Sequence, residues 1–506
     1  MQKALLALWS IALFMGSLAL HTRHQGFPYF YHPDEPGKVE QVISEDWNFH
    51  HPMLLLSATK VALEWNQKGR DEQSVVEAGR WVSAAFIASA IVALSLLAFI
   101  WRDWAGALTA GAVLSLHHQL YELAHYMKED SAMLMGLAMT FLAAAFYWQS
   151  PSRARAAFLG FACALAISGK YLGVLSLAVA LPVLWRGKSR AAFLYFAIPL
   201  LATLIVVNLP LLTHLSTFEK SLSREMGFVV HGQRGMTRSV PHSQYWSVFL
   251  DNSTPAIWLL LGVFLVARWR ERPMVTVAEW ALIAFPFIYA IILSFSPKSN
   301  DRYFLPATAV ITLLAVLGIE DAAHMLAGHV KRRTVLAGGA ALLLIFQVTG
   351  WSWSKPGIWQ YDEAFQHDDI REVIAYLNTE IPKNAVIVTD NRVGLPDPKR
   401  KKEASRLGTV PQTILSGRFA ADHGGVASLI EQGVSYVLVS ESDYGRFQLG
   451  SLRPQKGGEK EFARRKSFYE ELSRRGELLW ERERGTMIYL HPGIRVYKIS
   501  KPELRS

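Results

Sequence analysis

Two pairs of adjacent carboxylates, each close to a long apolar segment, could carry acid–base chemistry. Asp34 and Glu35 lie in the segment PDEPGK, and Glu129 and Asp130 lie in the segment HYMKED. A carboxylate that is partly withdrawn from water has a raised pKa and can take a proton from a hydroxyl group near neutral pH. The first pair therefore offers a candidate general base, and the second pair offers further acidic groups for the same site.

The first pair also suits the start of a helix. Proline is favoured in the first turn of a helix, which is where Pro36 would lie. Apolar residues recur at helical spacing from Val39 to Ile43, which predicts a short amphipathic helix after the acidic pair. In that interpretation Asp34 or Glu35 only caps the helix. The residues alone leave both interpretations open.

Three cations could hold a phosphate group. Lys170 in SGKY and Arg302 in DRYFLP each lie where two apolar segments meet, and Lys38 lies one helical turn beyond Asp34. Arginine presents a planar fork that binds phosphate through two hydrogen bonds, whereas lysine is a compact charge. Lys170 and Arg302 could equally anchor helix ends at a membrane surface. Lys38 could simply pair with Asp34 across one turn.

Metal binding has weaker support in the sequence. His50 and His51 are adjacent, and adjacent side chains do not face each other on a helix, which favours a polar packing role. No segment has the spacing that is typical of metal ligands, so a divalent cation stays possible and unassigned. The single cysteine, Cys163, lies in an apolar run, which excludes an intrachain disulfide.

Long apolar segments must position these groups. Of 506 residues, 51% are hydrophobic and only 19% are charged, against about 25% charged in typical soluble domains. A hydrocarbon core of roughly 30 Å needs about 20 apolar residues per helix. The composition therefore predicts an all-α membrane domain and excludes a soluble enzyme, a secreted disulfide scaffold and a β-barrel. We expect about eleven transmembrane helices, at residues 4–20, 81–100, 105–123, 131–148, 156–168, 171–185, 191–212, 253–267, 279–296, 303–319 and 334–353.

Basic residues gather in the short connections on one side of this arrangement. With a cytoplasmic N-terminus, every short basic cluster falls on the cytoplasmic side, as the positive-inside rule requires. These clusters are Arg102–Asp103, Arg153 with Arg155, Arg186 with Lys188 and Arg190, Arg268 with Arg270 and Arg272, and Lys331 with Arg332 and Arg333. The acidic pairs then lie on the outer face. Much of the net charge of +10 reports this topology, so no nucleic-acid partner is expected.

The composition changes near Trp353. We divide the chain into a transmembrane domain of residues 1–353, whose first outer loop spans 21–80, and an extracytoplasmic α/β domain of residues 354–506. Hydrophobic patterning in the second domain predicts two helices, two buried strands and a terminal hairpin. The helices are expected at 368–380 and 466–475, the strands at 385–389 and 436–440, and the hairpin at 485–499.

The order of these motifs resembles the GT-C membrane glycosyltransferases, specifically the family-39-like group. That group includes the protein O-mannosyltransferases and the lipid A aminoarabinose transferases. The resemblance rests on the segments PDE, HHP, HYMKED, GKY and DRYFLP and on the closing segment GIRVYKI. It covers all eleven predicted helices, and it implies a GT-C bundle with outer-face juxtamembrane helices.

The resemblance implies a glycosyltransferase of the inner membrane that acts on its outer face. A sugar on a polyprenyl phosphate would be moved, with inversion, to a hydroxyl of a protein, lipid or glycan acceptor. The site residues that it implies are Asp34 as base with Glu35 beside it, Lys170, Arg302 and Lys38 on the donor phosphate, and Glu129 and Asp130 orienting the acceptor or a metal.

Three other functions remain in competition. A lipid-linked glycan polymerase or ligase of the same fold would use a diphosphate-linked donor. A lipid or glycan transporter would usually show internal repeats and broken helices that meet at the midplane, and this sequence shows no repeat. A membrane scaffold that displays a small outer domain would leave the polar motifs of the outer face unexplained. The sugar, the carrier prenol and the acceptor are left open.

Overall fold

The computed structural model describes most of the chain. The described residues are 2–27, 32, 34–185, 190–231, 253–271, 275–296, 301–326, 329–350, 356–395, 409–448, 454 and 457–500. They form two units. The helical unit is built from residues before Gln360, and the sheet unit is built from residues after Trp359 together with Gly26, Phe27, His32 and His231.

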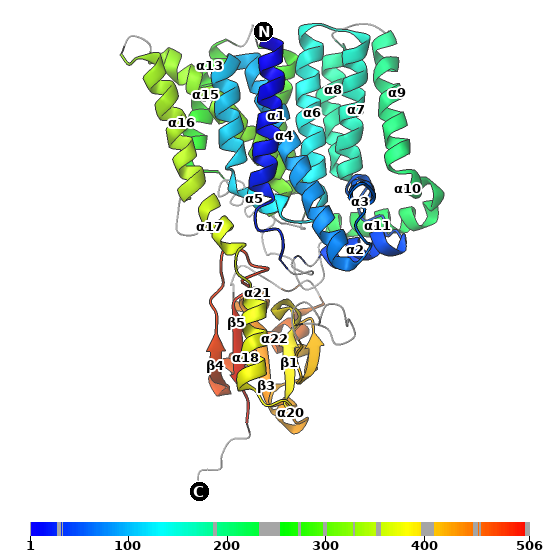
Figure 1. The fold of residues 1–506 in the computed structure, drawn as a ribbon, viewed down its shortest axis with the longest axis vertical. Coiled ribbons are helices and arrows are strands. Elements are labelled where there is room, and N and C mark those ends of the chain that lie inside the picture. The colour runs from blue at the N-terminus through cyan, green and yellow to red at the C-terminus, as the bar shows by residue number, and fades with distance from the viewer. Residues whose placement is uncertain are drawn as a thin grey trace. The chain divides into compact units, whose positions relative to one another are not determined.

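Long helices run side by side through the helical unit (Figure 1). All eleven segments predicted as membrane helices are largely helical. Seven helices are long and apolar enough to cross a membrane, so the chain is a multi-pass membrane protein. The elements in the predicted membrane segments are α1 (Gln2–His21), α4 (Glu72–Ser115), α6 (Glu129–Gln149), α7 (Arg153–Gly169), η1 (Tyr171–Leu175), α8 (Ser176–Trp185), α9 (Arg190–Val207), α13 (Pro255–Arg270), α14 (Val277–Ser294), α15 (Leu305–Met325) and α16 (Arg332–Thr349).

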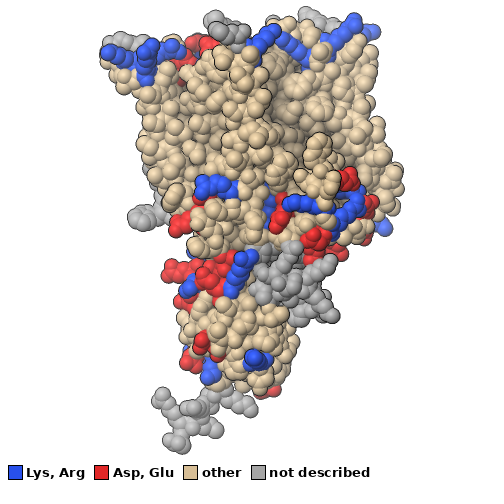
Figure 2. Space-filling model, in the orientation of Figure 1, with Lys and Arg blue, Asp and Glu red and all other residues tan. Residues whose placement is uncertain are grey.

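Two of the predicted helices meet within α4, whose backbone is non-helical at Arg102 and Asp103. The expected connection at Arg102 and Asp103 is a sharp break in the helix, where Asp103 has φ 50° and ψ −150°. Arg102 and Arg268 both donate to Asp321 Oδ1 at 2.9 Å, which fixes the break against α13 and α15. The described basic clusters lie at the end of the unit where α1 begins (Figure 2). Arg186, Lys188 and Arg272 of the predicted clusters lie outside the described residues.

Helices α6 and α7 approach each other so closely that glycine is required. A Cβ added to Gly136 would lie 2.1 Å from the backbone nitrogen of Ala166, and one added to Gly169 would lie 2.4 Å from that of Met133. Any larger residue would force the two backbones apart. These backbones therefore form a closely packed pair.

Short helices surround the opposite end of the bundle. The amphipathic helix predicted after the acidic pair is confirmed as α2, with Val39 and Val42 buried, although Ile43 is exposed. The short elements of this part of the chain are α2 (Glu35–Ser44), α3 (Leu54–Trp65), α5 (His118–Ala124), α10 (Leu209–Thr213), α11 (Leu215–His231) and η2 (Asp301–Phe304). The next helix in sequence is α17 (Ile358–Ala364).

The sheet unit is a five-stranded mixed sheet in the order β2-β1-β3-β5-β4. Strand β1 is parallel to β2 and β3, and β5 is antiparallel to β3 and β4. Val388 of β1 pairs with Leu415 of β2 and Val437 of β3, and Val437 also pairs with Tyr497 of β5. The elements are α18 (Asp369–Glu380), β1 (Val386–Asp390), η3 (Asn391–Val393), β2 (Thr413–Gly417), η4 (Ala420–His423), α20 (Val426–Glu431), β3 (Tyr436–Ser440), α21 (Glu441–Gln448), α22 (Glu459–Arg475), β4 (Glu477–Glu481) and β5 (Ile494–Lys498).

Four of the elements predicted for this unit are confirmed, and the hairpin is wrong. The predicted helices correspond to α18 and α22, and the two predicted buried strands correspond to β1 and β3. The partner of β5 in the expected hairpin is β4, which ends before residue 485. Residues 485–493 form turns and one isolated bridge between Arg484 and Pro492.

Candidate active site

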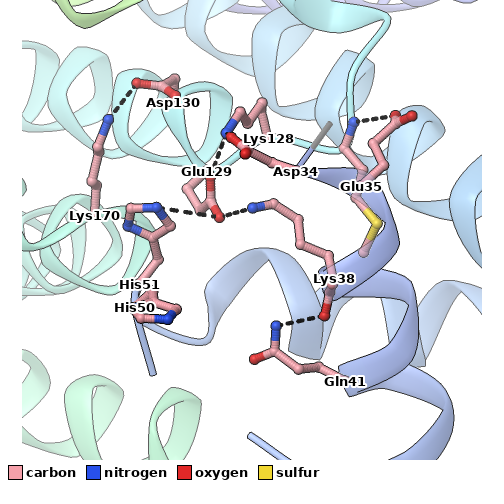
Figure 3. Close-up of polar contacts among 12 residues, drawn as sticks. Asp34, Glu35, Lys38, Gln41, His50, His51, Lys128, Glu129, Asp130 and Lys170 are labelled. Atoms are coloured by element: carbon pink, nitrogen blue, oxygen red, sulfur yellow. Dashed lines mark hydrogen bonds and ion pairs between the residues drawn. The ribbon is translucent and has the colours of Figure 1, made fainter. Parts of the chain in front are cut away.

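The seven predicted site residues lie at one end of the helical unit, away from the start of α1 (Figure 1). Four elements bring them there: the start of α2, the start of α6, the junction of α7 with η1, and η2. Figure 3 shows a chain of ion pairs among most of these side chains. Segments that are far apart in sequence therefore share one polar cluster.

Asp34 lies on the open side of this cluster. Its side chain is 44% exposed, and its Oδ2 atom is bound by Lys128 and lies 3.3 Å from Arg302 Nη2. Among the described residues at the start of α2, the Asp34 carboxylate accepts no capping hydrogen bond from a backbone nitrogen. The capping interpretation of Asp34 is therefore wrong, and its carboxylate is instead held by two cations.

Glu35 occupies a different environment from its neighbour. It is fully buried and accepts two hydrogen bonds from Arg80, from Nε at 2.9 Å and from Nη2 at 2.7 Å. The backbone nitrogen of Met127 donates to the same carboxylate at 3.1 Å. Glu35 therefore connects α2 to α4 and to the segment before α6, as a positioning group behind Asp34.

Glu129 lies at the centre of the ion pairs in Figure 3. It is bound by Lys38, and its other oxygen is 3.9 Å from Lys128 Nζ. His51 Nε2 lies 3.8 Å from Glu129, on the side away from Lys128. Lys38 therefore reaches across to α6, and its partner is Glu129 in place of the Asp34 considered from the sequence.

Asp130 holds the two other cations that the sequence singled out. Lys170 Nζ donates to it at 2.7 Å, and Arg302 Nε lies 3.9 Å from its second oxygen. The ring of Tyr303 lies below both cations, 4.5 Å from Lys170 Nζ and 5.5 Å from the Arg302 guanidinium carbon. Arg302 therefore bridges Asp34 and Asp130.

Sequence reasoning missed Arg80 and Lys128. Lys128 stands inside the motif HYMKED, where only the carboxylates were considered, and its position beside them was the available signal. Its side chain is 2% exposed, and burial is the main cause that lowers its pKa to about 8, with Arg302 lowering it further and Asp34 opposing the change. Arg80 is fully buried, and no pattern in the sequence links it to Glu35.

The histidines have polar partners within the helical unit. His50 Nδ1 lies 3.4 Å from Glu225, and His51 lies near Glu129, which fits the polar packing role. Among the described residues, no group of three or more His, Cys, Asp and Glu side chains could hold a metal ion. The cluster can hold an anion more readily than a cation, because Lys38, Arg80, Lys128, Lys170 and Arg302 outnumber Asp34, Glu35, Glu129 and Asp130.

Comparison with known proteins gave matches among solved structures only. No family model and no curated protein matches the chain. The crystal structure of ArnT from Cupriavidus metallidurans bound to undecaprenyl phosphate aligns with 99% of this chain and 99% of its own, at 11% identity and a TM-score of 0.50.

Two other membrane transferases align less well. The oligosaccharyltransferase of Archaeoglobus fulgidus in its apo form aligns over 87% of this chain and 70% of its own, at 11% identity and a TM-score of 0.47. The Pmt1-Pmt2 protein O-mannosyltransferase complex of S. cerevisiae bound to the sugar donor aligns over 46% of this chain and 38% of its own, at 16% identity and a TM-score of 0.34.

Proposed function

Because the chain has the GT-C-like fold of ArnT, we propose that it is an inverting glycosyltransferase that uses a polyprenyl-phosphate sugar. The observation that carries the proposal is the half-exposed Asp34 carboxylate, held by Lys128 and Arg302 at one end of a membrane bundle. The ArnT structure was solved with undecaprenyl phosphate, which supports a lipid phosphate as the carrier.

Asp34 removes the proton of the acceptor hydroxyl as its oxygen attacks the anomeric carbon. The bond from that carbon to the phosphate oxygen breaks, and the polyprenyl phosphate leaves with the bonding electrons. A direct displacement inverts the anomeric centre and needs no enzyme carboxylate as nucleophile. Negative charge grows on the departing phosphate, and fixed cations stabilise it most strongly where water is excluded.

Arg302 and Lys170 are the cations that we assign to that phosphate. Arg302 reaches both Asp34 and Asp130, and Lys170 lies on the opposite side of Asp130. Lys38 is 8% exposed and bound to Glu129, so we assign it a positioning role. Glu129 and Asp130 orient these cations, and they could also receive the acceptor.

A transfer assay with purified protein tests the proposal. We expect a sugar on a polyprenyl monophosphate to be transferred, with inverted configuration in the product. A sugar on a polyprenyl diphosphate should be a poor donor. The opposite preference would favour the polymerase or ligase function, and transport of an intact lipid-linked sugar without bond cleavage would favour a transporter.

Replacing Arg302 or Lys170 should weaken binding of the donor. Loss of a charge-assisted hydrogen bond typically costs about 1.5–3 kcal/mol, so Arg302→Ala should weaken donor affinity by more than about tenfold. Arg302→Lys should recover only part of it, because lysine lacks the planar fork. The measurement is the dissociation constant of a polyprenyl-phosphate sugar in detergent.

The matched control for these variants is Arg70→Ala, an exposed arginine that pairs with Glu45 and Glu64. Its donor affinity should equal that of the wild type. If Arg302→Ala and Lys170→Ala also bind donor normally and fold normally, both residues serve only to anchor helix ends.

Donor affinity should fall as the pH rises through about 8, where Lys128 loses its charge. The pKa of Lys128 in the folded protein lies below the ordinary value of 10.5. Between about pH 8 and 10.5, Lys128 binds more protons in the unfolded chain than in the folded protein. The free energy of unfolding therefore increases as the pH rises through this range. Loss of the Lys128 charge therefore does not destabilise the folded protein, so unfolding cannot explain the weaker donor binding at high pH.

Lys128→Gln removes the titrating group and should flatten this pH dependence. The measurement is donor affinity in both proteins at several pH values between about 6.5 and 9.5, which bracket the pKa of Lys128. An equal fall in both proteins would assign the titration to another group.

We further propose that the chain lies in the inner membrane with its N-terminus in the cytoplasm and its sheet unit outside. The gathering of basic residues at the end where α1 begins supports this orientation. Alkaline phosphatase fused after Ser506 should be active, because it folds only outside the cytoplasm. The same enzyme fused after Arg270 should be inactive, and the reverse pattern would contradict the orientation.

A further inference from the structure

The sheet unit has its own candidate ligand site, at the carboxyl ends of its parallel strands. In the strand order β2-β1-β3-β5-β4, the strands β1 and β3 are neighbours. The chain runs from β1 to β2 on one side of this pair, and from β3 to β4 and β5 on the other side. Ligands of open α/β sheets bind in the crevice outside the carboxyl ends of the strands where the connections diverge in this way. That position lies between β1 and β3.

Arginines follow all three parallel strands at this edge. Arg392 lies two residues beyond β1, Arg418 lies one residue beyond β2, and Arg446 lies in α21, directly after β3. Arg392 Nε and Arg446 Nη2 lie 3.5 Å and 3.2 Å from the same oxygen of Asp443. Guanidinium groups from distant parts of the sequence therefore converge on one point.

An aromatic ring holds the guanidinium groups together. Arg418, Arg446 and Arg465 lie over the ring of Phe419, with guanidinium carbons 5.6, 5.3 and 4.4 Å from its centre. Arg465 is compensated by Asp422, to which its Nε donates at 2.8 Å. Arg418 is exposed, and it has no ion-pair partner among the described residues.

A buried carboxylate fixes the frame beneath these arginines. Asp390, at the end of β1, accepts from the backbone nitrogens of Ala420 at 2.6 Å and Ser440 at 2.9 Å, and from the hydroxyl of Tyr469 at 2.7 Å. These bonds join the ends of β1 and β3 to η4 and α22. The arginines are thus carried by a rigid edge, which lowers the cost of ordering them around a ligand.

We propose that this edge of the sheet binds a phosphoryl group through Arg392, Arg418 and Arg446. Three converging forks, of which one is uncompensated, match an anion that has several oxygens around one centre. The phosphoryl group belongs to a soluble phosphomonoester or to a lipid headgroup, since both offer the same chemistry. This site lies within the sheet unit and does not depend on the sugar transfer proposed above.

The test uses the full chain in nanodiscs of zwitterionic lipid, with sn-glycerol 3-phosphate as the soluble probe. In a second arm, phosphatidic acid replaces part of the lipid. Binding of a soluble ligand should slow hydrogen exchange at residues 418–423 and 440–446 in the first arm. Binding of a lipid headgroup should slow exchange at the same residues in the second arm. Calorimetry with the soluble probe gives its dissociation constant.

Arg418→Gln should weaken binding by about tenfold or more and abolish the slower exchange, because it removes the uncompensated cation. This side chain is exposed, so the variant should fold normally. Arg475→Gln is the control, because Arg475 pairs with Glu471 one turn earlier on α22 and lies ten residues beyond Arg465. The Arg475→Gln variant should bind the probe as the wild type does. Absence of an effect in both arms, or an equal effect in Arg418→Gln, would overturn the site.

Discussion

Asp34→Asn is expected to reduce sugar transfer by about 10²–10⁴-fold, the usual contribution of a general base. Asparagine is nearly the same size but cannot accept the proton of the acceptor hydroxyl. Donor binding should persist, because the substitution removes a negative charge beside the proposed phosphate position and leaves Lys128 and Arg302 in place. The measurements are single-turnover transfer to a defined acceptor and donor affinity in the same preparation.

Glu40→Gln is the matched control for that variant. Glu40 lies on the exposed face of α2, close to Asp34 in sequence, and it undergoes the same change of charge. Its transfer rate should stay near that of the wild type. Near-normal transfer by Asp34→Asn would remove the base from the mechanism, whereas equal losses in both variants would point to the charge of α2 as a whole.

Arg80→Ala is expected to lower the free energy of unfolding by about 3–5 kcal/mol, which is typical when one partner of a buried ion pair is removed. The Glu35 carboxylate would stay fully buried without the two hydrogen bonds from Arg80, while the Met127 backbone nitrogen still donates to it. Activity should fall with stability, since Glu35 connects α2 to α4. Thermal and denaturant unfolding in detergent measure the change.

The double variant Arg80→Met with Glu35→Leu separates charge from packing. Replacing both buried partners by apolar residues is often close to neutral, so most of the lost stability should return. Arg70→Ala, which removes an exposed partner of Glu45, should cost less than about 1 kcal/mol. A loss of that same small size in Arg80→Ala would mean that water reaches Glu35.

The helices of the bundle could be predicted because each is a long apolar run with basic residues at one end. The break at Arg102 and Asp103 was predicted as a connection, since charge interrupts the apolar run there. The structure confirms it: Arg102 and Asp103 have non-helical backbone angles, with Asp103 at a left-handed φ, and they separate the two halves of α4. Apolar length marks a span, but it does not report how two spans are joined.

In the sheet unit, burial explains which strands could be predicted. Every residue of β3 is buried, and β1 is nearly so, which gives the continuous apolar runs of central strands. The edge strands β2 and β4 are mostly exposed or half-buried. Since β4 was not recognised as the partner of β5, the expected hairpin at 485–499 contained β5 and the turns before it but not β4.

The sequence predicted that the site residues gather at one face of the bundle. It did not predict which side chains form ion pairs with each other. Successive residues of a helix point about 100° apart, so the adjacent Asp34 and Glu35 have separate environments, one open and one buried. Charge spacing suggested the pair of Asp34 with Lys38, yet Lys38 binds Glu129 on a distant helix. Contacts between helices depend on tertiary packing, which spacing along the chain does not contain.

The close contact of α6 with α7 at Gly136 and Gly169 limits which elements of the site could change during evolution. Glu129 and Asp130 begin α6, and Lys170 follows α7, so the two backbones that touch at Gly136 and Gly169 also set the separation of these charges. That half of the site cannot widen without separating the α6 and α7 backbones at these glycines. A descendant with a different sugar or acceptor would therefore have to change α2 and η2, which carry Asp34 and Arg302 on short elements.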